Sequence, residues 1–141
     1  ARWQALVQEA EGRFSTDRRP SIEGADIDPG AIRAAKDNAR RADVVDTLSL
    51  RQRSIEDTPK VDGPGLVLAN PPFGLRVDGG ADLTKQWALW GDRLRQQRAG
   101  WRILLLAPGR ELADAAGAHG KPLLRFPHGG LDVALVDVSG R

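Results

Sequence analysis

Residues 70–74, Asn-Pro-Pro-Phe-Gly, are the part of this sequence best suited to chemistry. They directly follow the apolar run 66–69, which predicts a buried strand ending at this point. The side-chain oxygen of Asn70 and the carbonyl oxygen of Pro71 can both accept hydrogen bonds from one amino group, and Phe73 can stack on the ring that carries it. Two acceptors would also orient the lone pair of that amine toward an electrophile. The segment therefore suits recognition of an exocyclic amine of a nucleobase, although Asn-Pro and Pro-Pro also mark ordinary turns.

A second group of polar residues, Asp26-Ile27-Asp28, closes the strand that the sequence predicts at 21–27. Asp28 followed by Pro29 is a helix-start signal, because Asp caps helices and Pro fits the first helical position. Asp28 is therefore expected to be a cap. Asp26 is either an exposed acid in a turn or a group that binds a ligand.

The elements that must position these residues alternate along the chain. Helices are expected at 1–13, 28–42, 82–99 and 110–116, and strands at 21–27, 47–53, 65–70 and 101–107. Loops are expected at 14–20, 58–65 and 75–81. Two apolar runs, 122–126 and 131–138, are joined through Gly129-Gly130, which is typical of a β-hairpin. This order predicts an α/β fold with a mainly parallel sheet, helices on both faces and a C-terminal antiparallel hairpin. Such sheets bind ligands at the carboxyl ends of their strands, where Asn70 stands.

Composition excludes several classes of protein. The 141 residues are 40% hydrophobic and 28% charged, which fits a single globular domain over 1–141. No apolar run reaches the ~18 residues of a membrane span. Cysteine is absent and the two histidines are isolated, so no metal site is expected. A net charge of +2 indicates nucleic acid only weakly. The chain has no Met and starts at Ala1 within a helical pattern, so we expect a fragment or a processed piece.

Other conspicuous residues have simpler interpretations. Trp87 and Trp90 share a helical stripe with leucines and are expected to pack in the core. Three arginines near the end of that helix are expected to form a solvated face, with RNA contact as a less favoured alternative: Arg95, Arg98 and Arg102. His119 is expected in a surface loop.

The segment from Gly24 to Pro29, with Ile32 and Ala39, lies about forty residues ahead of the Asn-Pro-Pro-Phe-Gly motif. Together these residues resemble class I S-adenosylmethionine-dependent methyltransferases. The closest match is the RNA guanine-N2 methylase group, whose full-length members often carry an RNA-binding THUMP domain upstream. The resemblance extends from Trp3 to the final hairpin, and it is the combination of motifs that is specific. It implies a Rossmann-like methyltransferase fold and a cytoplasmic enzyme that uses S-adenosylmethionine.

The resemblance also implies roles for cofactor-binding residues. Asp26 would accept hydrogen bonds from the ribose hydroxyls of the cofactor, and Ile27 would pack on its adenine. Ser54, Ile55 and Asp57 would lie beside the adenine amino group. The family usually has an Asp where Ser54 aligns, so Asp57 or the Ser54 hydroxyl would have to substitute.

The same resemblance implies that Asn70, Pro71 and Phe73 hold the target base, with Asn70 also next to the cofactor. Catalysis in this class needs no metal and relies on placing the amine in line with the methyl-sulfonium.

One departure from the family is large. Its first strand and glycine-rich loop have no counterpart in this sequence, which suggests a catalytic domain truncated at its N-terminus. The missing strand would lie between the strand ending at Asp26 and the one ending at Asn70. We therefore expect the chain alone to bind the cofactor poorly. We also expect the two exposed strand edges to be repaired by pairing across the gap, by forming a homo-oligomer, or by retaining an N-terminal segment.

The leading interpretation is an N-methyltransferase acting on guanine N2 in rRNA or tRNA. Adenine N6 of DNA or RNA is an alternative target. A non-catalytic methyltransferase-like module that binds RNA or protein is a further alternative, supported by the missing glycine loop. A dinucleotide-dependent dehydrogenase is weakly supported, because no G-x-G-x-x-G fingerprint occurs at a strand–helix junction.

Overall fold

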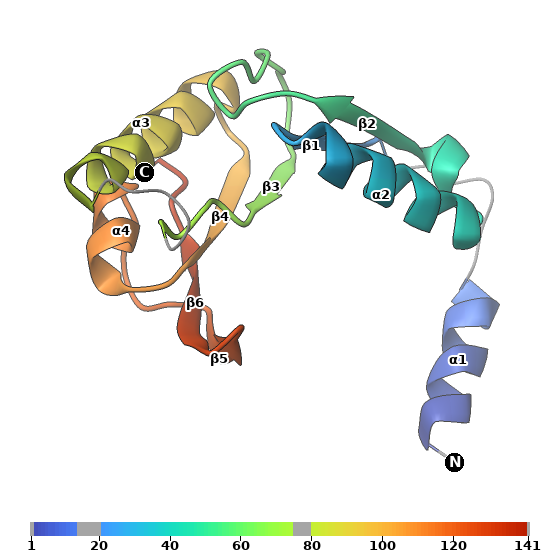
Figure 1. Ribbon diagram of the computed structural model, residues 1–141. Coiled ribbons are helices and arrows are strands. Elements are labelled where there is room, and N and C mark those ends of the chain that lie inside the picture. Colours follow the sequence, from blue (N-terminus) through green and yellow to red (C-terminus); the bar gives the residue numbers. More distant parts are fainter. Residues whose placement is uncertain (1, 14–20, 75–79, 141) are drawn as a thin grey trace. The chain divides into compact units, whose positions relative to one another are not determined.

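A computed structural model describes residues 2–13, 21–74 and 80–140 (Figure 1). The chain forms two compact units, Ala1–Arg53 and Ser54–Arg141. Whether both belong to a single domain over 1–141 stays a prediction.

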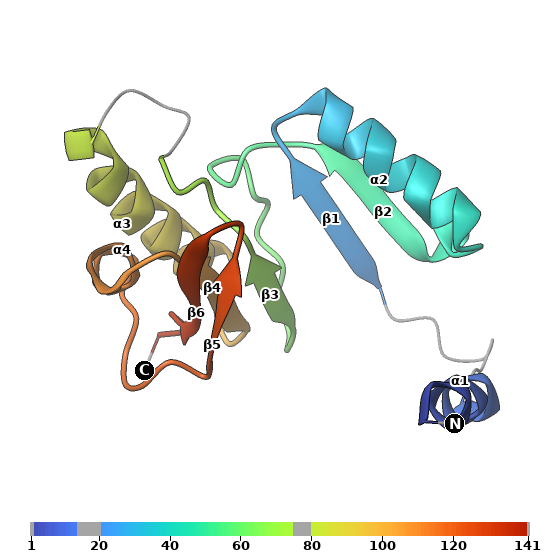
Figure 2. The ribbon, with the colours of Figure 1, turned by 60° about the horizontal axis from the view of Figure 1, so that its bottom comes forward.

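The first unit is built on a pair of parallel strands. β1 (Ile22–Asp26) pairs with β2 (Leu48–Gln52) so that Asp26 lies opposite Gln52 at their carboxyl ends. α2 (Pro29–Arg41) connects them, followed by the short 3-10 turn η1 (Val45–Thr47), and α2 runs along both strands (Figures 1 and 2). Its buried residues are Ile32 and Ala39.

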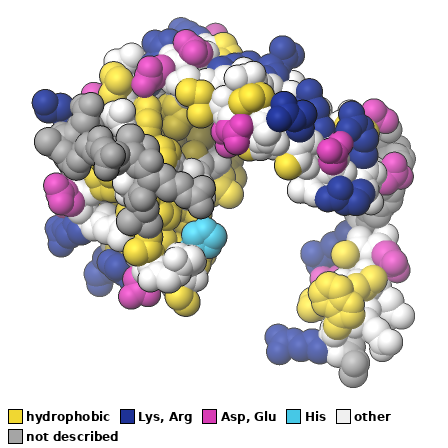
Figure 3. Space-filling model, in the orientation of Figure 1, with side chains coloured by type: hydrophobic (Ala, Val, Ile, Leu, Met, Phe, Trp, Pro, Cys, Tyr) yellow, Lys and Arg dark blue, Asp and Glu magenta, His cyan; other side chains and the backbone are white. Residues whose placement is uncertain are grey.

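α1 (Arg2–Arg13) precedes this pair and confirms the predicted N-terminal helix. None of its residues, all of which are described, is buried. Trp3 is 76% exposed and Leu6 is 53% exposed. Hydrophobic side chains gather on one side of α1 (Figure 3).

The second unit contains a four-stranded mixed sheet in the order β3-β4-β6-β5. β3 (Leu66–Ala69) is parallel to β4 (Arg102–Ala107), and β6 (Leu131–Asp137) is antiparallel to both β4 and β5 (Leu124–His128). α3 (Gly80–Gln97) and α4 (Arg110–Ala115) lie on the same side of this sheet (Figure 2). The core between them confirms the predicted packing of Trp87 and Trp90, which are 0% and 9% exposed. The fold is therefore α/β with the predicted C-terminal hairpin.

A strand forms at 66–69 as predicted, but the prediction that it is buried is wrong. Leu66 and Leu68 are 58% and 66% exposed, and only the alternate residues Val67 and Ala69 pack toward the core. The reason is that β3 has one strand neighbour, β4, among the described residues, and α3 and α4 cover only the opposite face of the sheet. An apolar run alone does not tell how many neighbours a strand has.

The hairpin lies two residues later in its first strand than the sequence predicts, at 124–128 instead of 122–126. Gly129 and Gly130 form its turn with φ of 58° and 83°. Two consecutive positive φ values are typical of the type I′ turn, which matches the twist of the flanking strands. Glycine is favoured at both positions for this reason.

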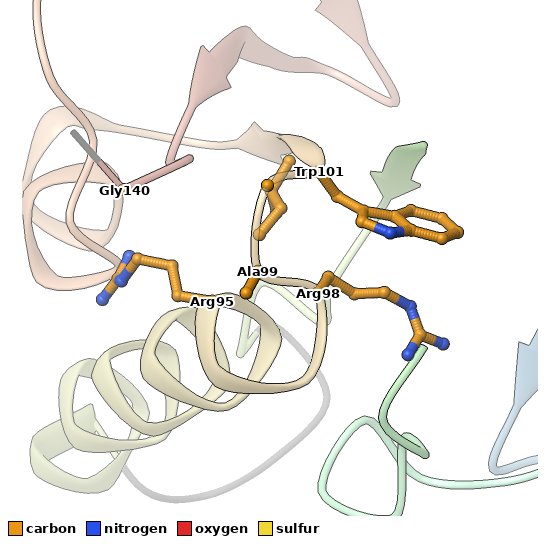
Figure 4. A pocket seen from close by; sticks show the side chains of 7 residues that line it. Arg95, Arg98, Ala99, Trp101 and Gly140 are labelled. Atoms are coloured by element: carbon orange, nitrogen blue, oxygen red, sulfur yellow. The ribbon is translucent and has the colours of Figure 1, made fainter. Parts of the chain in front are cut away.

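The prediction of a solvated arginine face is wrong for Arg95 and Arg98. Arg98 is 7% exposed, donates to the carbonyl oxygens of Pro59 and Gln97, and lies 5.1 Å from the ring centre of Trp101. Arg95 donates to the carbonyl oxygens of Ala116 and Val138 at 2.7 and 3.1 Å. Both line a cavity of about 450 Å³ at the amino end of β4, between α3 and the C-terminal segment (Figure 4). Arg102 is exposed, as expected, and pairs with Asp137 at 3.1 Å.

A small network anchors the end of β6 to β4. The Ser139 hydroxyl donates to Asp137 Oδ1 at 2.6 Å and accepts from the backbone N–H of Ile103 at 2.8 Å. The Ser139 backbone N–H also donates to Asp137 Oδ1, at 3.0 Å. The hydrogen bond from the Ser139 side chain is the main cause that lowers the pKa of Asp137, outweighing partial burial, with smaller contributions from the Ser139 backbone and Arg102.

Among the described helices, none combines the length and the hydropathy needed to cross a bilayer.

Candidate functional site

Asn70 stands where predicted, directly after β3 at the carboxyl end of the sheet. Asn70 is exposed, whereas Pro71 is buried. Neither the Asn70 side chain nor the Pro71 carbonyl oxygen is hydrogen-bonded to any described residue. Two hydrogen-bond acceptors are therefore available next to each other at the end of β3. This is the arrangement that recognition of an amino group requires.

α3 and the core hold this segment in place. The indole Nε1–H of Trp87 donates to the Pro72 carbonyl oxygen at 3.2 Å. Phe73 is half-buried and packs against the core that α3 forms with the sheet. Gly74 has a φ of 80°, and a Cβ there would lie 2.6 Å from Cδ2 of Leu83. The segment is thus a fixed turn and not a loose loop.

The loop expected at 75–81 lies mostly outside the described residues. α3 begins at Gly80, two residues earlier than predicted, and residues 75–79 are not described. The loop expected at 14–20 is also outside the described part of the chain.

Asp26 lies at the carboxyl end of β1, in a turn fixed by three hydrogen bonds. Its Oδ1 accepts from the backbone N–H of Asp28 at 2.8 Å, and its carbonyl oxygen accepts from the N–H of Arg53 at 2.9 Å. The Gln52 side chain donates to the Ile27 carbonyl oxygen at 3.1 Å. Asp26 Oδ2 accepts no hydrogen bond from the described residues, and Ile27 is 71% exposed. The turn therefore presents one available carboxylate oxygen beside an exposed aliphatic side chain.

Asp28 is confirmed as the N-cap of α2. Its Oδ1 accepts from the backbone N–H of Gly30 at 2.7 Å, and Pro29 occupies the first helical position. This local role fully accounts for Asp28, which leaves Asp26 as the acid available to a ligand.

Residues 54–57 form a tight turn at the start of the second unit. The Ser54 hydroxyl accepts from the Glu56 backbone N–H at 3.2 Å, and the Asp57 N–H donates to the Ser54 carbonyl at 3.2 Å. Arg93 of α3 donates to the Glu56 carbonyl at 2.8 Å. Ile55 is half-buried against the core, and Asp57 is exposed. The Ser54 hydroxyl still has its own hydrogen to donate.

The residues implicated by the sequence are thus found at strand ends in both units. The convergence of Asp26 and Asn70 on one ligand stays a prediction. Two supporting residues, Trp87 and Gln52, were missed as site residues because each acts through a backbone carbonyl oxygen. Because Gln52 stands at the end of a predicted strand, the sequence indicated that its side chain could support the turn after Asp26. No feature of the sequence indicated that Trp87 supports the segment after β3. Within the described residues, no group of three or more His, Cys, Asp or Glu side chains could hold a metal ion.

His119 needs no functional role. His119 is exposed and its backbone N–H donates to the Asp137 carbonyl oxygen, as expected of a surface loop residue.

The family model described as RMKL-like, methyltransferase domain matches residues 1–127. A protein of Chromohalobacter salexigens named ribosomal RNA large subunit methyltransferase K/L is 33% identical over 140 residues, covering 95% of this chain and 19% of that protein. The protein of the same name from Syntrophotalea carbinolica is 31% identical over 141 residues, covering 96% of this chain and 20% of that protein. The chain therefore spans about a fifth of the length of these curated relatives.

Solved structures share the fold. SMU.472, crystallised in complex with SAH, superimposes with a TM-score of 0.82 at 22% identity, covering 98% of this chain and 36% of that chain. A protein from Listeria monocytogenes described as a predicted N6-adenine-specific DNA methylase gives a TM-score of 0.69 at 27% identity, covering 94% of this chain and 34% of that chain.

Proposed function

We propose that this chain forms part of an S-adenosylmethionine-dependent enzyme that methylates an exocyclic amino group of a base in RNA. The chain belongs to the RMKL-like methyltransferase domain family. The observation that carries this proposal is the pair of available acceptors, Asn70 and the Pro71 carbonyl, at the carboxyl end of β3. The family match and the fold shared with SMU.472, which was crystallised with SAH, support the choice of cofactor.

The residues present fit part of this cofactor. The available Oδ2 of Asp26 can accept a hydrogen bond from a ribose hydroxyl, while Oδ1 keeps the turn in place through Asp28. The exposed side chain of Ile27 offers an apolar surface for a purine. We further assign Ser54, Ile55 and Asp57 to the surroundings of the adenine amino group, with the Ser54 hydroxyl or Asp57 as its polar contact. When bound, the cofactor would supply a methyl group activated by a positively charged sulfur.

At the other end of the site, Asn70 and Pro71 would act on the target base. The Asn70 side-chain oxygen and the Pro71 carbonyl oxygen would each accept one N–H of the same amino group, which leaves the nitrogen lone pair directed away from both acceptors. The Phe73 ring would stack on the base and fix its plane. Positioning of this kind reduces the entropic part of the barrier and requires no side chain that ionises near neutral pH.

The target we favour is guanine N2 in ribosomal RNA, or in tRNA. The names of the relatives from Chromohalobacter and Syntrophotalea, which are ribosomal RNA methyltransferases, support ribosomal RNA. Adenine N6 of DNA or RNA is the second candidate, because the Listeria protein is described as acting on it. Both bases carry an exocyclic amine that two acceptors can hold. An RNA substrate of this kind would place the enzyme in the cytoplasm.

We propose that both units belong to one methyltransferase domain, since the family match at 1–127 runs through both. Within their own units, β1 pairs with β2 and β3 pairs with β4. The repair of the unpaired strand edges stays part of this proposal, and a second copy of the chain or an N-terminal segment could complete them.

Methyl transfer to RNA tests the proposal. The complete gene product is incubated with methyl-labelled S-adenosylmethionine and ribosomal RNA, and the RNA is digested to nucleosides. We expect label in N2-methylguanosine. Label in N6-methyladenosine would favour the second candidate. A folded protein that binds RNA and transfers no label would overturn the enzymatic proposal in favour of a binding module.

A further inference from the structure

We propose that Phe126 and His128, at the tip of the β5–β6 hairpin, form a second contact with RNA by stacking on bases a few nucleotides away from the methylated one. This inference rests on the proposed function and extends it to the way in which the substrate strand is held. Neither residue belongs to the sites assigned above.

The first observation is that β5 is exposed and carries aromatic rings. All five residues of β5 are exposed, and Phe126 is 37% exposed. The Phe126 and His128 rings contact each other edge to face, with centroids 6.5 Å apart and planes at 75°. Neither ring is part of the core that α3 and α4 cover. The two rings therefore hold each other in place at the surface and do not contribute to that core.

The second observation is the register, which brings the hairpin tip to the same edge of the sheet as Asn70. Ala107, the last residue of β4, pairs with Ala134, and the hairpin continues beyond this pair to Phe126 opposite Val133 and His128 opposite Leu131. β5 is three strand spacings from β3, or about 14 Å. This distance corresponds to about four stacked nucleotides at about 3.4 Å each.

The rings also share a face of the sheet with Asn70. Side chains that lie opposite each other on neighbouring strands project from the same face, and the relevant pairs are Leu68 with Leu104, Leu104 with Asp137, and Leu135 with Leu124. Phe126 and His128 follow Leu124 in two-residue steps along β5. Asn70 follows Leu68 in the same step, so the alternation places it on this face as well. One strand of RNA could then reach both places without crossing the sheet.

The backbone of β5 is poorly suited to pairing with a further strand, which is another common use of an exposed edge strand. Pro127 lies within β5 and has no N–H to donate, and prolines in edge strands oppose the addition of a further strand. The side chains, and not the backbone, are therefore the feature that this strand offers to a partner.

Position favours RNA over a protein partner at this tip, because the rings lie at the same edge and on the same face of the sheet as Asn70. Arg125 is exposed and precedes Phe126 in the chain, but the alternation along β5 places it on the opposite face of the sheet, and Arg110, just after the carboxyl end of β4, has a side chain that is 91% exposed. Opposing acids are Asp132, across from Pro127, and Asp114, which pairs with Arg110 at 3.2 Å. Exposed aromatic rings on which bases can stack are a feature that single-stranded nucleic acid binding uses. Exposed Leu124 adds apolar surface, so docking of a protein remains an outcome for the test to decide.

The test compares Phe126→Leu, which removes the ring and keeps apolar bulk, with Phe126→Tyr, which keeps the ring. His128→Ala is a second variant at the exposed tip, and His119→Ala is its matched control on the loop that pairs with Asp137. Each is made in the complete gene product. Affinity for a transcribed fragment of large-subunit ribosomal RNA is measured by fluorescence anisotropy, together with KM for RNA, kcat, affinity for S-adenosylmethionine and melting temperature.

We expect Phe126→Leu to weaken RNA binding and raise KM for RNA about 5- to 20-fold, the fold-change for loss of one modest stacking contact. His128→Ala should act in the same direction. Phe126→Tyr and His119→Ala should match the wild type, and affinity for S-adenosylmethionine should not change in any variant.

Wild-type RNA affinity in both Phe126→Leu and His128→Ala would overturn the inference while leaving methyl transfer intact. Equal loss in Phe126→Tyr and Phe126→Leu would also overturn it, because a ring would then not be the recognised feature and a protein contact would be favoured. If the wild-type protein itself neither binds nor methylates RNA, the proposed function fails, and this inference fails with it.

Discussion

The two carboxylate oxygens of Asp26 have different surroundings, and this difference makes a testable statement about one residue. Oδ1 supports the turn through the Asp28 N–H, while Oδ2 is available for a ligand. We predict that Asp26→Ala weakens binding of S-adenosylmethionine to the complete gene product about 10- to 100-fold, as expected for a lost hydrogen bond to a charged group. Isothermal titration measures the effect, with Asp46→Ala, an exposed acid in η1, as control. Affinity within twofold of wild type would contradict the role given to Asp26.

Asp137 gives a prediction about pH. Because the Ser139 hydroxyl lowers the pKa of Asp137 in the folded protein, the folded state favours the charged carboxylate. This stabilisation is present above the pKa of the unfolded chain, about 3.9, and is lost as the pH falls through the lower folded value. Asp137→Asn should therefore melt at a lower temperature than wild type at pH 7, and the gap should shrink below about pH 4. Thermal melting followed between pH 2 and 7 checks this, and a gap independent of pH would contradict it.

Single residues with local roles were predictable from the sequence. Asp28 was recognisable as a cap because the cap, the proline and the helix are adjacent in the chain. Arg98 was misread because its partners, Pro59 and Trp101, depend on how the loop after the second strand packs against α3, which helical spacing does not reveal.

At the scale of elements, α3 does more than cover the sheet, because Trp87 fixes the Asn-Pro-Pro segment. We predict that Trp87→Phe, which keeps a ring and removes the hydrogen bond to Pro72, lowers kcat for methyl transfer several-fold and leaves affinity for S-adenosylmethionine unchanged. Trp90→Phe is the matched control, since Trp90 lies on the same helix with its ring centre 6.4 Å from that of Trp87 and its indole does not bond to Pro72. Equal effects of both substitutions on kcat would indicate a general loss of packing.

Element types followed well from the sequence, whereas burial did not. The hairpin at Gly129-Gly130 and the helix after Asp28-Pro29 have local signals, and both form where expected to within two residues. The exposure of Leu66 and Leu68 follows from how many strands and helices surround β3, which is set by the whole sheet and not by the four residues themselves.

At the scale of the whole molecule, both sheets of the described chain have unpaired strand edges, and two leucines of β3 are exposed. β1 and β3 each have one strand neighbour among the described residues, and Leu66 and Leu68 lie on the exposed face. We predict that the 141-residue chain self-associates at micromolar concentration, and that Leu68→Lys shifts it toward monomer, since charge near a strand edge opposes pairing. Light scattering after gel filtration measures the mass. A monomeric wild-type chain would contradict self-association and leave an N-terminal segment as the remaining way to complete these edges.

The central claim is that Asn70 holds the amine that receives the methyl group. Its most direct test is methyl transfer to RNA by Asn70→Ala in the complete gene product, measured together with the Kd for S-adenosylmethionine. Asn38→Ala, an exposed asparagine of α2, is the matched control. We predict that kcat of Asn70→Ala falls about 100-fold while the Kd stays within a few-fold of wild type. Turnover near the wild-type rate would contradict the claim.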